Sequence, residues 1–60
     1  RRSEQLVGRV VPLERAIERG AGRVQMADAY WEVSGPDLPA GANVRIVGTE
    51  GMTLRVEAVE

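Results

Sequence analysis

The chain of 60 residues contains no cysteine, no histidine, no lysine and no phenylalanine. Without cysteine it can form no disulfide and no thiolate metal site. Without histidine or lysine, it lacks the side chains that most often activate a serine, so Ser3 and Ser34 have no partner for nucleophilic chemistry. The carboxylates are dispersed along the sequence and form no catalytic constellation. We therefore expect a protein that is not an enzyme and that holds no cofactor and no metal ion.

Charge weakens the case for a nucleic-acid or lipid ligand, and hydropathy excludes a membrane span within this sequence. Eight arginines face nine acidic residues, and the formal net charge of -1 gives little long-range attraction to nucleic acid or anionic lipid. Uncharged apolar runs are only a few residues long, too short for any part of this sequence to cross a bilayer. The length allows one small domain. Because the sequence begins with Arg1 rather than Met, we expect it to be part of a longer protein.

The strongest local pattern is a hairpin over residues 43–60. Apolar and polar residues alternate on both sides of a turn that contains glycine, which is typical of strand, turn and strand. A three-residue loop over 49–51 pairs Ile46 with Leu54, and it places the apolar residues of both strands on one inward face.

A second hairpin is predicted over residues 23–34. Met26 then faces Trp31 across a turn at Asp28 and Ala29, and the valines of the two strands face each other on the same inner side. The outer side of this hairpin holds four polar or aromatic residues: Arg23, Gln25, Tyr30 and Glu32.

The segments before this hairpin are less regular. Residues 6–13 are apolar and β-branched and predict a strand, with Gly8 marking a bulge, a bend or a close backbone approach and Pro12 its end or a sheet edge. Residues 14–22 fit either a two-turn helix or a loop, and the loop is favoured because so short a helix does not persist alone. Ile17, within this segment, is expected to anchor into the core in either case.

Residues 35–41 contain two prolines and two glycines and predict a crossing loop, from which Leu38 closes one end of the core. Five short strands in a chain of this length predict an all-β fold, a small closed or nearly closed barrel. The expected core consists of Val10, Val24, Met26, Trp31, Val33, Leu38, Val44, Ile46, Leu54 and Val56.

One local cluster is basic and consists of Arg9, Arg15, Arg19 and Arg23. Small barrels bind single-stranded nucleic acid through a basic groove with exposed aromatic side chains. Here Glu14 and Glu18 dilute the positive charge, and Tyr30 is the one candidate for stacking on a base. A solvated rim with a few ion pairs is therefore the favoured interpretation, and nucleic-acid binding is kept as the alternative function.

Residues 6–60 resemble the C-terminal soluble domain of NfeD-like membrane proteins. The motifs that carry this resemblance are LVGRVVPLE, GRVQMADAYWEVSGPDLPAGANVRIVG and the LRVE that follows. The short bacterial form of the family is the best match, and it implies a five-stranded OB-fold-like barrel. The sequence departs from the family pattern in two places, a loop with Ala16, Arg19 and Ala21 and a turn with Ala27 and Ala29.

The resemblance also implies a function. Residues 1–5 are expected to be a linker or tail that follows transmembrane helices, and residues 6–60 a non-catalytic interaction domain. The full-length protein would lie in the cell (inner) membrane, with this domain soluble and on the cytoplasmic side. Its partner would be a stomatin- or flotillin-like (SPFH) membrane protein. The candidate partner-binding residues are Arg23, Gln25, Tyr30 and Glu32.

Overall fold

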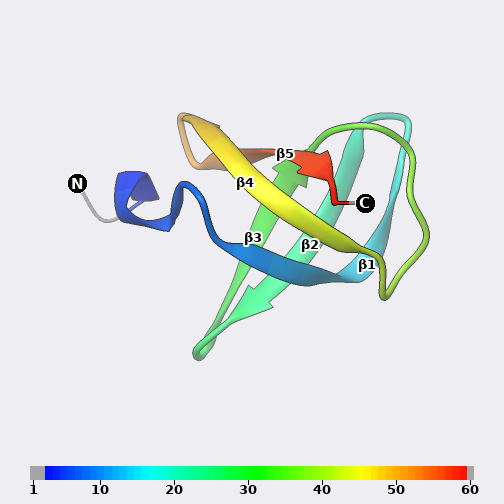
Figure 1. Ribbon diagram of the computed structural model, residues 1–60, viewed down its shortest axis with the longest axis horizontal. Helices are drawn as coiled ribbons and strands as arrows, with labels where there is room; N and C mark the ends of the chain where they lie inside the picture. The colour runs from blue at the N-terminus through cyan, green and yellow to red at the C-terminus, as the bar shows by residue number, and fades with distance from the viewer. Residues whose placement is uncertain (1–2, 60) are drawn as a thin grey trace.

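The computed structural model describes residues 3–59, and its five strands close into a single barrel (Figure 1). A short 3-10 helix comes first, and the elements follow in the order η1 (Ser3–Leu6), β1 (Val10–Glu18), β2 (Ala21–Met26), β3 (Ala29–Ser34), β4 (Asn43–Glu50) and β5 (Thr53–Ala58). Around the barrel the order is β1-β2-β3-β5-β4, and every pairing is antiparallel except that of β3 with β5. The predicted all-β, five-stranded barrel is confirmed.

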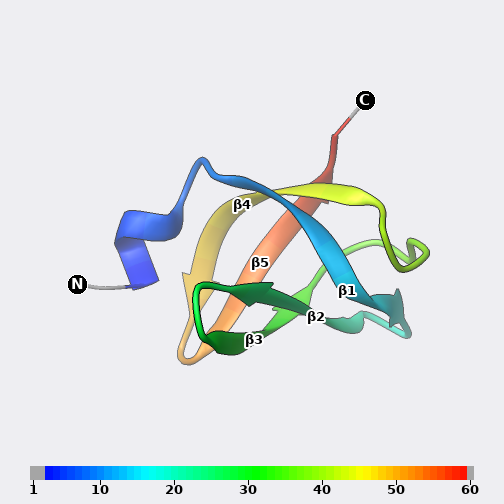
Figure 2. The same cartoon turned by 90° about the horizontal axis from the view of Figure 1, so that it is seen from below.

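The first strand closes the barrel because it pairs on both sides. The start of β1 pairs with β4, where Val10 lies opposite Arg45, and its end pairs with β2, where Glu18 lies opposite Ala21. The register of β1 against β2 shifts twice, first between Leu13 and Arg15 and again before Glu18. Such irregularities bend a strand, and the bend carries β1 from one side of the barrel to the other (Figure 2).

The sequence-based interpretation of the first third of the chain needs correction. The sequence predicts a strand over 6–13, but β1 begins at Val10 and continues to Glu18, so residues 14–18 are neither helix nor loop. The connection to β2 is only the two-residue turn Arg19-Gly20, with φ angles of 55° and 83°. Both values fit a type I′ turn, whose twist matches that of the flanking strands. Of the three features that the sequence allows at Gly8, the structure has a bend before the strand, with a φ of 98°.

The tail predicted over residues 1–5 lies in part outside the described residues, since the structure begins at residue 3. Its described part belongs to η1 (Ser3–Leu6).

The β2–β3 hairpin has the predicted faces but not the predicted register. Its turn lies at Ala27 and Asp28, so Met26 pairs with Ala29, and Val24 pairs with Trp31. This is two residues away from the register that the sequence predicts. A shift of two residues leaves each side chain on its own face, because side chains alternate with period two.

The β4–β5 hairpin also differs in register from the prediction. Its turn lies at residues 51 and 52 rather than 49–51, and Ile46 pairs with Val56 instead of Leu54. The register shifts between Ile46 and Gly48, where β4 carries one extra residue. This bulge restores the inward direction that a two-residue turn alone would have reversed. The predicted inward face is therefore confirmed, although the pairing is not.

The core is made by residues from all five strands, and its buried members are Leu13, Ile17, Val24, Met26, Val33, Val44, Ile46, Leu54 and Val56. Ile17 is 1% exposed, which confirms its role as an anchor. Leu38 and Trp31 are partly buried and pack against this core. Val10 was expected inside but is 47% exposed, whereas Leu13, absent from the expected core, is buried. The difference follows from the alternation along the start of β1, before its register shifts: Val10 points outward, while Val11 and Leu13 point toward the core.

Truncation of Ile17 tests its role as the buried anchor of β1, in contrast to the exposed Val10 of the same strand. Ile17→Ala removes a fully buried side chain, and we expect a loss of about 2–5 kcal/mol in the free energy of unfolding. The matched control is Val10→Ala in the same strand, where half of the side chain is already in water, so the loss should stay below about 1 kcal/mol. Thermal denaturation followed by circular dichroism measures both. Equal melting temperatures for the two variants would contradict the observed course of β1.

Candidate functional site

The four residues that the sequence marks as partner-binding lie together on the outer surface of the β2–β3 hairpin. Arg23 lies opposite Glu32, and Gln25 lies opposite Tyr30. Tyr30 is 59% exposed, among the most exposed large apolar side chains of the described residues. The result is a surface, here called the hairpin face, in which an aromatic ring lies among charged and amide groups.

Arg23 is the centre of the hairpin face because two neighbours hold its guanidinium group. Its Nε donates a hydrogen bond of 2.8 Å to Oε1 of Glu14, which extends from β1. Its Cζ lies 4.5 Å from the centroid of the Tyr30 ring, within the range of a cation–π contact. These contacts restrict a long, flexible side chain in advance, so less conformational entropy remains to be lost when a partner binds.

The hydrogen bond also fixes the charge of both partners. The bond from Arg23 holds the pKa of the Glu14 carboxyl below its ordinary value of 4.5, and the same bond raises the pKa of Arg23. Glu14 is the member of this surface that the sequence does not reveal. Read as part of a helix or loop, it has no relation to Arg23; only the pairing of β1 with β2 brings the two together.

The four arginines of the basic cluster do not form one groove. Arg15 lies opposite Arg23 across β1 and β2, and Arg19 lies in the turn that follows β1. Arg9 precedes β1 and lines a groove together with Gln5 and Leu6 of η1. The helix η1 lies at the end of the barrel opposite the β1–β2 turn (Figures 1 and 2). On the hairpin face, Glu14 and Glu32 flank Arg23, and the Arg23 guanidinium covers one face of the Tyr30 ring. Tyr30 is exposed, but the carboxylates interrupt the positive charge on the hairpin face, and this face lacks the continuous basic groove that single-stranded nucleic acid needs.

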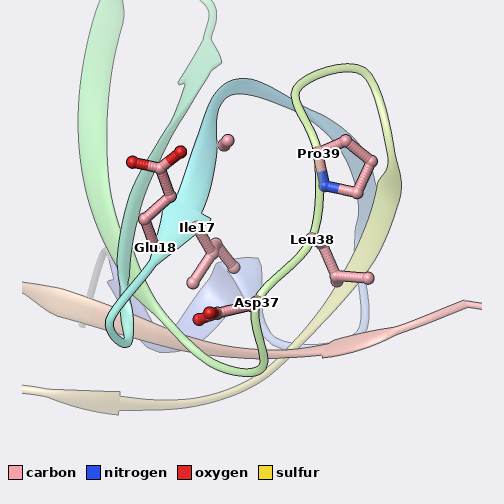
Figure 3. Close-up of a pocket in the computed structure, with 6 residues that line it drawn as sticks. Ile17, Glu18, Asp37, Leu38 and Pro39 are labelled. Carbon is pink, nitrogen blue, oxygen red and sulfur yellow. The ribbon is translucent and has the colours of Figure 1, made fainter.

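A shallow groove of about 350 Å³ lies where β1 ends against the crossing loop (Figure 3). Its floor is the paired backbone of Ile17 and Leu38, in which Ile17 N donates to Leu38 O at 2.9 Å and Leu38 N donates to Ile17 O at 3.2 Å. Two carboxylates, those of Glu18 and Asp37, belong to its lining. Across residues 3–59 no three side chains of His, Cys, Asp or Glu gather where they could hold a metal ion. This groove therefore offers a surface contact and no evident chemistry.

Comparison with known proteins places this chain in a family. Residues 3–57 match the family described as the NfeD-like C-terminal, partner-binding domain. Over 59 residues the chain is 41% identical to the inner membrane protein YbbJ of Escherichia coli (strain K12). That match covers 97% of this chain but only 39% of YbbJ, so the chain spans well under half the length of this relative.

A solved structure has the same fold. The C-terminal domain of the stomatin operon partner protein 1510-C from Pyrococcus horikoshii superposes with a TM-score of 0.83. The superposition covers 95% of this chain and 92% of that domain, at 20% sequence identity. The structural likeness shows that the two chains share the barrel fold. The family match over residues 3–57 shows that the sequence is related as well. The chain belongs to the NfeD-like C-terminal, partner-binding domain family.

Proposed function

We propose that this chain is the non-catalytic interaction domain of a membrane-anchored protein, and that its partner is a stomatin- or flotillin-like (SPFH) membrane protein. The observation that carries the proposal is the family match over residues 3–57, whose description is a partner-binding domain. The stomatin-like partner is supported by the solved domain of the same fold, which is a stomatin operon partner protein. Membrane anchoring is supported by the relative YbbJ, an inner membrane protein of which this chain spans 39%.

The anchor would lie in a part of the protein outside this sequence. Among the described residues no helix is both long and apolar enough to cross a bilayer. The chain enters the barrel through η1. The β2–β3 turn and the β4–β5 turn lie at the same end of the barrel (Figures 1 and 2). We propose that transmembrane helices precede η1 and that the domain lies on the cytoplasmic side of the inner membrane.

The hairpin face is the proposed contact surface. Tyrosine and arginine at the centre of an interface carry a large share of binding energy, because they bury much area and still satisfy their polar groups. Tyr30 and Arg23 are such a pair, and the hydrogen bond to Glu14 holds Arg23 in place before a partner arrives. Gln25 and Glu32 surround the pair and offer hydrogen bonds at the rim.

Removal of the Tyr30 ring tests this surface. Tyr30→Ala should lower the affinity for the soluble domain of an SPFH partner by about 1–2 kcal/mol, because an anchor residue of the interface is lost. The melting temperature should barely change, since the ring is largely in water already. Isothermal titration calorimetry of the two purified domains measures the affinity.

The matched control is Arg55→Ala. Arg55 belongs to β5, which neighbours β3, and it lies opposite Ser34 of β3. Its side chain is 53% exposed, so it belongs to the outer surface beside the hairpin face. Its loss should leave the affinity unchanged. Unchanged binding by both variants would rule out the hairpin face as the contact surface, and a larger loss from Arg55→Ala would move the contact to β5.

The alternative function, binding of single-stranded nucleic acid, is tested by a salt titration with a labelled oligonucleotide. Contacts with several phosphates would make the affinity fall steeply as salt rises. Because Glu14 and Glu32 flank Arg23 on the hairpin face, we expect no binding at physiological salt. Measurable affinity with a steep salt dependence, followed by fluorescence anisotropy, would favour the nucleic-acid module instead.

A further inference from the structure

A second, narrower groove lies at the η1 end of the barrel, away from the hairpin face. Its volume is about 240 Å³, and it runs between η1 and the tip of the β2–β3 hairpin. The residues that line it are Gln5, Leu6, Arg9, Met26, Ala27, Ala29 and Trp31. We call it the tryptophan groove, after Trp31, the one tryptophan of the sequence.

Both walls of the tryptophan groove are fixed by backbone hydrogen bonds. On one side, Gly8 N donates to Ile46 O at 2.7 Å, Ile46 N donates to Arg9 O at 2.9 Å, and Arg9 N donates to Leu6 O at 3.1 Å. These bonds tie the segment after η1 to β4. On the other side, the ladder of β2 and β3 is continuous from Ala21 to the turn. The groove is therefore largely formed before any ligand arrives, which reduces the entropy lost on binding.

The size and lining of the groove narrow the class of occupant. Sites for small molecules and cofactors usually have about 300–1,000 Å³, which is more than this groove provides. The volume suits one apolar side chain from another polypeptide. The floor is apolar, since Leu6 and Trp31 pack against the core and Met26 belongs to it. Among the described residues that line the groove, Arg9 is the one with a charged side chain, so a carboxylate beside that apolar side chain would complement it.

The conformation of Ala27 supports a role for its methyl group. Its φ is 53°, in the left-handed region that glycine adopts freely and other residues adopt at a cost. Glycine would relieve this strain in the hairpin turn, but it would remove a methyl group from the wall of the tryptophan groove. Backbone strain of this kind is commonly found at binding sites.

From these observations we propose that the tryptophan groove is a docking site for a partner peptide, in which an apolar side chain is followed by a carboxylate. The apolar side chain lies against Trp31 and Met26, and the carboxylate accepts hydrogen bonds from Arg9. This site is distinct from the hairpin face, and the proposal does not depend on which protein supplies the peptide.

The test uses the fluorescence of Trp31 as a direct signal, since the sequence has no other tryptophan. The probes are two capped peptides that differ in one group, acetyl-Gly-Leu-Glu-Gly-amide and acetyl-Gly-Leu-Gln-Gly-amide. The acidic probe should produce a saturable blue shift, because the leucine displaces water from the indole. The glutamine probe should bind about threefold more weakly, because it cannot form the exposed ion pair with Arg9, and such pairs are weak in water.

Two variants separate this docking from a general effect. Arg9→Gln should remove the preference for the acidic probe while the glutamine probe binds as before, which also shows that the variant is folded. Ala27→Gly should raise the melting temperature by a few degrees and yet weaken both probes, because strain is relieved while the groove wall is lost. Greater stability with weaker binding is a combination that a merely structural role of Ala27 would not produce.

Three results would overturn the proposal. One is the absence of any saturable shift with either probe at millimolar concentration. Another is an equal response to both probes that Arg9→Gln leaves unchanged. A third is a blue shift with phosphatidylglycerol vesicles but none with the peptides, which would make this end of the barrel a lipid-binding surface. The hairpin-face variant Tyr30→Ala serves as a further control and should bind both probes like the unmodified chain.

Discussion

The barrel depends on one strand that must pair with two different neighbours. β1 has nine residues, and it meets β4 at its start and β2 at its end, so it has to bend between them. Its end is fixed by Ile17, whose backbone exchanges two hydrogen bonds with Leu38 of the crossing loop. Gly22 makes room for this side chain, since a Cβ on Gly22 would lie 2.6 Å from Ile17 Cγ1. Once β1 is bent and fixed, no long sheet edge is left between β2 and β4.

The alternation of apolar residues predicts which way side chains point, but not which residues pair. In the β2–β3 hairpin the turn lies at Ala27 and Asp28 rather than at Asp28 and Ala29. Every side chain still lies on its predicted face, because the pairing shifts by two residues and the alternation is preserved. In the β4–β5 hairpin a bulge after Ile46 has the same consequence. Bulges and turn positions depend on packing between strands, and a single sequence carries only weak signals for them.

The course of β1 could not be read from local sequence. Residues 14–18 have no clean alternation, and they extend only because β2 and the crossing loop supply hydrogen-bond partners from other parts of the chain. Local sequence likewise predicts only part of the hairpin face and of the tryptophan groove. The alternation in β2 and β3 predicts that Arg23 and Tyr30 lie together on the outer side, as they do. The contact of Arg23 with Glu14, and the meeting of η1 with the hairpin tip, require the closed barrel.

One strand, β3, supplies a central residue to each of the two surfaces. Tyr30 and Trp31 are adjacent, and neighbouring side chains of a strand point to opposite sides. Tyr30 therefore lies on the hairpin face, while Trp31 turns toward the core and the tryptophan groove. A single extended partner segment could contact both surfaces by passing over the hairpin tip at Ala27. Two modest contacts joined in this way would act at high effective concentration, so two small surfaces would together bind the partner more tightly than either alone.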